Sequence, residues 1–343
     1  MGPSSLIEAA HESPALRGDR PRVRIRDVSP RLTFQAQAGT TAQKLALIER
    51  LIACGIRSVE VSSFVHPRLV PGLADAEQVF AGIRRRDDVS LECCVGNLAG
   101  LRRAIDARAD AAWFLLSADE EFSRANIGRS IDDSLEELAR MMELANGSAT
   151  RLGTYVIAVF GGMTGLPRGP REFAPTAKRL AQMGVVRWIL ADSFGYAAPT
   201  QIREMVEFAA TQTDRGQLTV QIHDSRGMGL ANIAELVRLG IRNIDTSLAG
   251  SGAHPALPQA RVGGICTEDA VQMLELMGVD TGVDLAALID TANWFDRELG
   301  GREKGFTRHV GRVPTAAAGT SAAAGVNAFA WTKHQFAPGD REK

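Results

Sequence analysis

Short apolar runs rich in β-branched residues alternate with amphipathic stretches along most of the chain. The runs with the length and composition of buried strands are Arg22–Val28, Ser58–Ser62, Ser90–Val95, Ala111–Leu116, Gly153–Phe160, Val186–Ala191, Leu218–His223 and Arg242–Ser247. Between them apolar residues recur at helical spacing, as from Thr41 to Cys54, where Gly55 ends the pattern. Thr41, Ser130 and Thr267 are placed to cap three such helices. This alternation predicts β–α–β units and a parallel sheet.

Roughly eight such units fall within about 290 residues, which is the count and size of a (β/α)8 barrel. A doubly wound open sheet is the main alternative, but the glycine-rich phosphate fingerprint expected after its first strand is absent. We therefore predict an α/β fold with a TIM barrel at residues 21–312. The lack of periodicity in residues 1–20 predicts a flexible N-terminal arm. The composition of residues 313–343 predicts a C-terminal extension of low complexity with an aromatic cluster.

Composition narrows the classes of partner and location. The 343 residues include 39 Lys and Arg and 40 Asp and Glu. The resulting net charge of −1 gives no excess of positive charge that would indicate binding to nucleic acid or to an anionic membrane. The spacing of Cys54, Cys93, Cys94 and Cys266 fits neither a zinc ribbon nor a disulfide scaffold and indicates reduced thiols. With no signal peptide and no apolar run of membrane-spanning length, the sequence predicts a cytoplasmic protein.

Polar residues gather where the predicted strands end, which is where TIM barrels carry their chemistry. They are Asp27, Arg31, Gln35, Glu60, Ser62, Ser63, His66, Asn97, Asp192, Ser193, Gln221, His223, Asp224, Asp245, Thr246, Ser247 and His254. Structural roles are open for several of them: Asp27 or Glu60 could form a buried ion pair with Arg31, and Asp224 and Asp245 could cap loops. Carboxylates, an arginine and histidines converging on one rim nevertheless indicate a site.

Five longer stretches resemble one known family. They are SVEVSSFVHPRLVPGLAD (Ser58–Asp75), SADEEFSRANIGRS (Ser117–Ser130), LADSFGYAAP (Leu190–Pro199), IHDSRGMGLAN (Ile222–Asn232) and TEDAVQMLELMGVDTGVDL (Thr267–Leu285). In this order they resemble the 3-hydroxy-3-methylglutaryl-CoA (HMG-CoA) lyases, which are metal-dependent TIM-barrel lyases of the pyruvate carboxyltransferase-like superfamily. The resemblance covers about residues 22–312, and it implies chemistry at a carbon–carbon bond next to a carbonyl.

The first family motif is only partly kept. In the family it reads GPRDGLQ, where the arginine stabilises a developing enolate and the aspartate binds a divalent cation. In the matching stretch VSPRLTFQ (Val28–Gln35), Arg31 and Gln35 agree with the motif, and Leu32 stands in place of the aspartate. The resemblance therefore implies that Arg31 keeps its role while one metal ligand is lost.

The later motifs show the same kind of change. The family's HxHD motif supplies two histidine ligands, and here Gln221 replaces the first while His223 keeps the second. Gly264 stands where the family has an asparagine ligand, and His254 stands where it has a cysteine that acts as acid or base. His223 is thus the only surviving family ligand, and losing several ligands predicts weak metal binding. We therefore expect a metal-independent site with no tightly bound cofactor.

The predicted site residues fall into two groups. Catalytic roles are predicted for Arg31, Glu60, Asp192, His223 and His254, and substrate binding for Gln35, His66, Asn97, Ser193 and Gln221. The resemblance places Glu60, Asn97 and Asp192 at family positions near the substrate. Arginine can hold a carboxylate or enolate oxygen through its planar fork, and histidines can move protons near neutral pH.

The predicted function is that of a divergent HMG-CoA lyase-like enzyme. It would make, cleave or rearrange a bond next to a carbonyl in a small carboxylate or acyl-thioester, with a CoA thioester as a candidate substrate, and the family favours a homodimer. Two alternatives stay open. One is a non-catalytic pseudoenzyme that binds a ligand, and the other is a metal-dependent lyase with an ion site rebuilt around His223, His66, Glu60 or His254.

Overall fold

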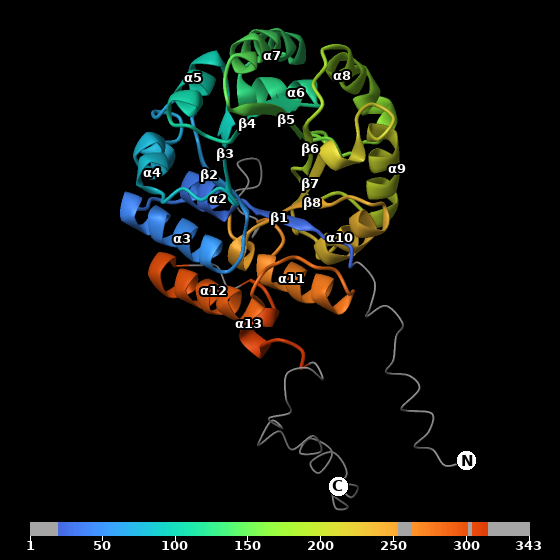
Figure 1. The fold of residues 1–343 in the computed structure, drawn as a ribbon. Coiled ribbons are helices and arrows are strands. Elements are labelled where there is room, and N and C mark those ends of the chain that lie inside the picture. The colour runs from blue at the N-terminus through green and yellow to red at the C-terminus, as the bar shows by residue number, and fades with distance from the viewer. Residues whose placement is uncertain (1–19, 253–262, 301–303, 315–343) are drawn as a thin grey trace, which may run out of the picture. The chain divides into compact units, whose positions relative to one another are not determined.

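Eight parallel strands close into a barrel in the order in which they follow along the chain (Figure 1). The computed structural model describes residues 20–252, 263–300 and 304–314. The strands are β1 Arg24–Asp27, β2 Ser58–Ser63, β3 Ser90–Val95, β4 Ala111–Ser117, β5 Arg151–Ile157, β6 Trp188–Asp192, β7 Leu218–Ile222 and β8 Asn243–Thr246. The TIM-barrel prediction is confirmed, and each predicted strand overlaps an observed one.

A layer of helices surrounds the barrel and buries its outer face. The main helices are α2 Ser29–Ala36, α3 Thr41–Ala53, α4 Ala76–Gly82, α5 Leu98–Asp106, α7 Ile131–Asn146, α8 Pro170–Gln182, α9 Pro199–Ala209, α10 Gly229–Arg238, α11 Thr267–Leu276 and α12 Leu285–Leu299, with shorter turns at α6 Glu120–Phe122, η2 Pro71–Leu73, η3 Ser123–Ile127, η4 Arg215–Gln217, η5 Leu248–Gly250 and α13 Thr307–Val310. None of the described helices is both long and apolar enough to cross a membrane.

The predicted helix caps are partly confirmed. Ser130 caps α7 in a capping box with Asp133, as expected. The cap of α3 is Thr40, one residue before the predicted Thr41. The cap predicted at Thr267 is wrong, because this residue is the first of α11 and its hydroxyl donates instead to Asp27, at 2.6 Å.

The stretch Val28–Gln35, which matches the first family motif, lies in helix α2 from Ser29 onward, with Val28 as the N-cap. Pro30 lies in the first turn, where its missing N–H and fixed φ are tolerated. Ser29 donates to Asp27 through its backbone N–H, at 2.9 Å, and through its hydroxyl, which ties the start of the helix to the end of β1. The helix places Arg31 and Gln35 one turn apart on one face, where Arg31 Nη1 donates to Gln35 Oε1 at 3.2 Å.

A buried ion cluster fills the barrel interior around Arg26. Its guanidinium contacts Glu60 and Asp245 at 2.5 Å each and Glu92 at 2.9 Å, so one cation joins carboxylates from β2, β3 and β8. Burial alone would raise the pKa values of Glu60 and Glu92, but Arg26 holds both below their usual range. Burial raises the pKa of Asp245 to about 7, and the attraction of Arg26 only partly offsets it. The charge balance of the interior therefore depends mainly on the guanidinium of Arg26, with Arg31 as the second partner of Glu60.

The predicted arm at 1–20 and tail at 313–343 fall almost entirely outside the described residues, which leaves both as predictions. The four cysteines are all buried and none forms a disulfide. Burial raises the pKa values of all four thiols, and Cys94 also donates to Glu60 at 3.1 Å. Since the thiolate is the reactive form, these residues have the environment of structural cysteines.

Replacing Arg26 with methionine should destabilise the barrel strongly. The substitution leaves Glu92 and Asp245 without their ion-pair partner and Glu60 with Arg31 alone, and breaking a buried pair of this kind costs about 3–5 kcal/mol. Arg140→Met is the matched control, since Arg140 is an exposed arginine that pairs with Glu137 at i,i+3, and its loss should cost under about 1 kcal/mol. Urea denaturation followed by circular dichroism measures the free energy of unfolding of both variants. Equal losses of stability would contradict the large contribution proposed for Arg26.

Replacing Asp245 with asparagine should flatten the dependence of stability on pH. The folded-state pKa of about 7 lies above the ordinary value of 3.8, so the stability that this group contributes is complete at low pH and lost as pH rises through about 7. The wild type should therefore lose on the order of 1–3 kcal/mol more than Asp245→Asn between pH 5 and pH 8. The free energy of unfolding, measured at both pH values, gives this difference. Parallel profiles would show that Asp245 does not titrate in this range.

The native protein should resist thiol reagents. Burial and raised pKa values predict that none of the four cysteines reacts with dithionitrobenzoate within minutes at pH 7.5, and that all four react in denaturant. The absorbance of the released thionitrobenzoate measures both states. A thiol that reacts in the native protein at the rate of a free cysteine would contradict the structural assignment.

Candidate active site

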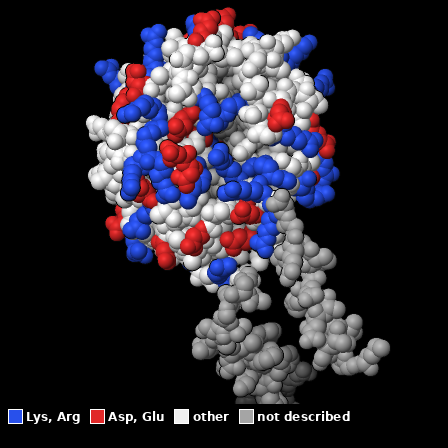
Figure 2. All heavy atoms as spheres, in the orientation of Figure 1, with Lys and Arg blue, Asp and Glu red and all other residues white. Residues whose placement is uncertain are grey.

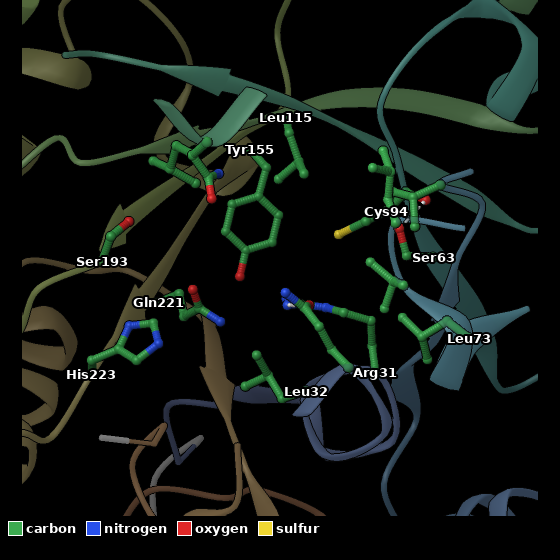
Figure 3. A pocket seen from close by; sticks show the side chains of 16 residues that line it. Arg31, Leu32, Ser63, Leu73, Cys94, Leu115, Tyr155, Ser193, Gln221 and His223 are labelled. Atoms are coloured by element: carbon green, nitrogen blue, oxygen red, sulfur yellow. Dashed lines mark hydrogen bonds between the residues drawn. The ribbon is translucent and has the colours of Figure 1, made fainter. Parts of the chain in front are cut away.

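A hollow of about 320 Å³ opens where the strands end, at the side of the barrel that carries chemistry in this fold (Figure 3). Its lining residues are Arg31, Leu32, Gln35, Ser63, Val65, Leu69, Val70, Leu73, Cys94, Leu115, Asn126, Tyr155, Ile157, Ser193, Gln221 and His223. Of the ten predicted site residues, Arg31, Gln35, Ser193, Gln221 and His223 are therefore brought together around one space.

Arg31 supplies the cation of this hollow. Glu60 holds it through Nε and Nη2, at 2.6 Å each, so the guanidinium is fixed from one side. Burial alone would lower the pKa of Arg31, but Glu60 keeps it above its ordinary value, so the side chain stays charged. The remaining nitrogen, Nη1, donates to Gln35 at 3.2 Å, and both side chains line the hollow, where a carboxylate or enolate oxygen could accept from the guanidinium.

Glu60 lies between two arginines rather than in the hollow. Oε1 accepts from Arg26 at 2.5 Å and Oε2 accepts from Arg31 at 2.6 Å. Arg26 and Arg31 lower the pKa of this carboxyl against the effect of burial, so it stays ionised and committed to both guanidinium groups. This geometry is that of a group that positions Arg31.

Gln221 and His223 come from the end of β7 and face Arg31 across the hollow (Figure 3). The Nε2 group of Gln221 is buried and has no hydrogen-bond partner among the described residues. Buried N–H groups are nearly always paired, so this donor calls for an acceptor. Nδ1 of His223 lies 3.0 Å from the carbonyl oxygen of Asp192, which can only accept, so Nδ1 carries the proton and Nε2 has the lone pair in the neutral ring.

Asp192 shapes the turn that follows β6. Its carboxylate accepts from the backbone N–H groups of Tyr196, at 2.9 Å, and Ala197, at 3.1 Å. Burial raises the pKa of this carboxyl to about 6, although both N–H groups favour its charged form. Its carbonyl orients His223, and the neighbouring Ser193 lines the hollow while accepting from the N–H of Ala158 at 3.0 Å.

Glu60 and Asp192 support residues of the hollow without lining it, and three further predicted residues are not placed there. Asn97 caps α5 by accepting from Gly100 N–H at 2.8 Å, and His66 is exposed and accepts from Arg68 N–H at 3.2 Å. Neither lines the hollow. His254 lies outside the described residues, so its role stays a prediction.

The structure shows, residue by residue, which acidic side chains have the ion-pairing or capping roles left open by the sequence. Glu60 does form the buried pair with Arg31, whereas Asp27 binds Ser29 and Thr267 instead. Asp224 caps the start of α10 by accepting from Gly229 N–H at 2.9 Å. The capping role suggested for Asp245 is wrong, because this residue joins the Arg26 cluster.

Sequence reasoning missed Tyr155, Cys94 and Asn126, which all line the hollow. Tyr155 is buried, its hydroxyl donates to Asp245 at 3.3 Å, and the guanidinium of Arg31 lies 5.9 Å from its ring centroid. In a strand of apolar residues, a tyrosine looks like ordinary core, so no signal marked it. Asn126 lies in a π-helical turn, a rare element that often occurs at functional sites, and its stretch carried the family resemblance.

The divalent cation implied by the resemblance would find few donors among the described residues. Gln221 and His223 offer an amide and an imidazole, and Leu32 offers none. Within residues 20–252, 263–300 and 304–314, no group of three or more His, Cys, Asp or Glu side chains could hold a metal ion. Since divalent sites in proteins use three or more ligands, these side chains alone do not fit one.

Comparison with known proteins extends the resemblance. The family model described as HMGL-like matches residues 22–294. The 3-hydroxy-3-isohexenylglutaryl-CoA/hydroxy-methylglutaryl-CoA lyase of Pseudomonas aeruginosa is 34% identical over 281 residues, which cover 81% of this chain and 93% of that one. The mitochondrial hydroxymethylglutaryl-CoA lyase of Gallus gallus is 34% identical over 283 residues, with 82% and 95% covered. An HMG-CoA lyase from Acinetobacter baumannii, solved with coenzyme A and 3-methylmalate, superposes with a TM-score of 0.81 at 31% identity, with 86% and 98% covered.

These relatives correct the prediction on cofactors. We expected no divalent metal and no tightly bound cofactor, but the HMG-CoA lyases that match this chain depend on a divalent metal, and one was solved with coenzyme A. The expectation of a metal-free protein is therefore contradicted. The prediction was wrong because it was drawn from a few replaced ligand positions. The similarity to these lyases extends over four fifths of the chain.

The cytoplasmic location and the homodimer stay predictions, since the relatives include proteins named as mitochondrial and as cytoplasmic. The family itself is shown by the extent of the match. The model covers residues 22–294, and a third of the residues are identical to lyases of similar length that share the barrel. This chain belongs to the HMGL-like family of TIM-barrel lyases.

Proposed function

We propose that this protein is a carbon–carbon lyase that acts on a small branched carboxylate carried as a CoA thioester. The observation that supports the proposal is the set of donors that converge on one hollow. The charged Arg31 and the amide N–H of Gln221, which has no partner among the described residues, both face the hollow that Tyr155 also lines (Figure 3). Such a set matches a ligand with several acceptor oxygens and negative charge.

The chemistry is a retro-aldol cleavage. A base removes the proton from a tertiary hydroxyl group, and the C–O bond becomes a carbonyl. The bond between the carbinol carbon and the carbon next to the thioester breaks, and its electron pair moves onto the thioester oxygen as an enolate. Arg31, held by Glu60, is placed to stabilise this oxyanion, because a fixed donor in a buried site costs little reorganisation. Protonation of the enolate carbon releases the acyl-CoA product.

His223 is the described residue best placed to move the proton. The carbonyl of Asp192 fixes the ring through Nδ1–H, which leaves the lone pair on Nε2. This nitrogen can accept the hydroxyl proton and return it to the enolate carbon. Gln221, on the same strand, is placed to hold a carboxylate or hydroxyl oxygen of the substrate during the transfer.

The apolar wall of the hollow fits a branched substrate. Leu32, Leu69, Val70 and Leu73 give the hollow apolar surface in addition to the polar residues of β7. A methyl or longer branch on the carbinol carbon would contact these side chains, while the carboxylate lies near Arg31 or Gln221. The Pseudomonas aeruginosa relative is named for both a methyl and an isohexenyl substrate, so branched 3-hydroxyglutaryl thioesters are the class to test first.

Arg31→Gln should lower kcat/KM for cleavage of the active thioester by about 100- to 1,000-fold, because it removes the charged donor that meets the enolate. The assay supplies 3-hydroxy-3-methylglutaryl-CoA and longer-branched analogues and quantifies the acyl-CoA product by mass spectrometry. Arg102→Gln removes the same charge from an exposed helix position away from the hollow and should leave kcat/KM unchanged. Circular dichroism of each variant confirms that the barrel is folded.

Two results would contradict the proposal. Arg31→Gln and Gln221→Leu could both turn over as fast as the parent, which would remove the chemistry from this hollow. Alternatively, calorimetry could show thioester binding to the parent with no product from any of the thioesters, which would identify a binding protein without activity.

A further inference from the structure

A second hollow, of about 210 Å³, opens at the opposite end of the barrel, where the strands begin. Its lining residues are Arg24, Arg26, Ser58, Glu92, Trp113, Arg151, Arg187, Gly216, Gln217, Thr219 and Asn243. It shares none of its lining residues with the candidate active site. The strands run clockwise from β1 to β8 in Figure 1, and because β–α–β crossovers are right-handed, this view looks onto their amino ends.

Positive charge at this hollow exceeds negative charge. Arg24, Arg151 and Arg187 form no ion pair with any described residue, and Arg26 is already paired within the barrel. The only carboxylate in the lining is Glu92, which accepts from Arg26, Trp113 and two serines, Ser58 and Ser90. Figure 2, in the orientation of Figure 1, shows Lys and Arg side chains on both sides of the hollow in the middle of this face.

Arg187 is the most informative of these arginines. Its guanidinium lies 4.5 Å from the ring centroid of Trp113, which holds it against the barrel floor. Nη1 is buried, yet it has no hydrogen-bond partner among the described residues. Burial, together with the nearby charges of Arg151, Arg26 and Arg24, lowers the pKa of Arg187 to about 10 against the opposing effect of Glu92. An arginine kept for solubility alone would instead extend its donors into water.

We propose that the hollow at the amino ends of the strands binds a small phosphate-bearing anion through Arg187, Arg151 and Arg24. A phosphate group carries up to two negative charges and several acceptor oxygens, so it can accept from all three guanidinium groups at once. The size of the hollow suits a phosphate or diphosphate group and excludes a folded polymer. This site is separate from the lyase chemistry and does not depend on it.

Isothermal titration calorimetry with sodium pyrophosphate, and separately with inorganic phosphate, tests the proposal. The full chain is titrated at low ionic strength and neutral pH, because screening weakens exposed charge interactions. Arg187→Gln and Arg151→Gln should each weaken binding by about tenfold or more, as expected when a charged donor is lost. Arg187→Lys should weaken it less, because the charge stays while the fork is lost.

Two control variants locate the site. Arg84→Gln removes an exposed arginine that lies outside the lining of this hollow, and its affinity for pyrophosphate should match the parent. Arg31→Gln removes the cation of the other hollow and should also bind pyrophosphate like the parent. Thermal unfolding without ligand checks that each variant is folded, and Arg151→Gln stands in if Arg187→Gln does not fold.

Three outcomes would overturn the proposal. The parent could give no heat beyond that of sodium chloride at equal ionic strength. Arg84→Gln could lose as much affinity as Arg187→Gln, which would show general attraction to a basic surface. Arg31→Gln could abolish binding while Arg187→Gln and Arg151→Gln leave it unchanged, which would place the anion in the candidate active site.

Discussion

The buried guanidinium of Arg26 is the interaction on which the rest of the barrel depends. It lies at the centre of the interior and joins carboxylates that start on three different strands, Glu60, Glu92 and Asp245. In a medium of low dielectric constant, three carboxylates this close would repel one another strongly without a cation between them. A core of apolar side chains would give comparable stability, so the cluster fits a functional requirement better than a purely structural one.

That requirement is the position of Arg31. Glu60 uses one oxygen for Arg26 and the other for Arg31, so the interior cluster fixes the guanidinium that faces the candidate active site. On the other side of the hollow, the carbonyl of Asp192 fixes His223 in the same indirect way. The groups that face the substrate are thus held by partners that do not face it, which is how buried sites keep reactive groups within a narrow geometry.

The same cluster separates two environments of different charge. Toward the ends of the strands, Arg31 is balanced by Glu60, and the neighbouring donors Gln221 and Tyr155 are neutral. Toward their beginnings, Glu92 is already occupied by Arg26, so three further arginines have no carboxylate partner among the described residues. One chain with a net charge of −1 therefore has a locally basic face that its overall composition does not reveal.

The fold and half of the site could be predicted from the sequence, for physical reasons. Strands buried on both faces give largely apolar runs, so both ends of β3 were predicted correctly. Because TIM barrels carry their chemistry where the strands end, Arg31, Gln221 and His223 were predicted to lie on one rim. The conformation of Val28–Gln35 could not be predicted, because the helix depends on the bond between Ser29 and a buried Asp27. Sequence also does not show that Asn97 uses its side chain to cap its own helix.

The interior cluster was missed because a charge within a short strand does not show how deep in the barrel it lies. Arg24 and Arg26 are two residues apart on β1, so they share one face and both line the second hollow, yet Arg24 at the start of the strand is exposed and Arg26 is buried. The prediction on the metal was wrong for a different reason, since single ligand positions were considered without the length of the family match.

The central claim is that Arg31 and Gln221 hold the substrate oxygens. A crystal structure of the protein with coenzyme A and 3-methylmalate, the ligands of the Acinetobacter baumannii relative, tests it most directly. The account predicts ligand oxygens within about 3.2 Å of the Arg31 guanidinium and of Gln221 Nε2. Ligands bound elsewhere, or in this hollow without either contact, would contradict it.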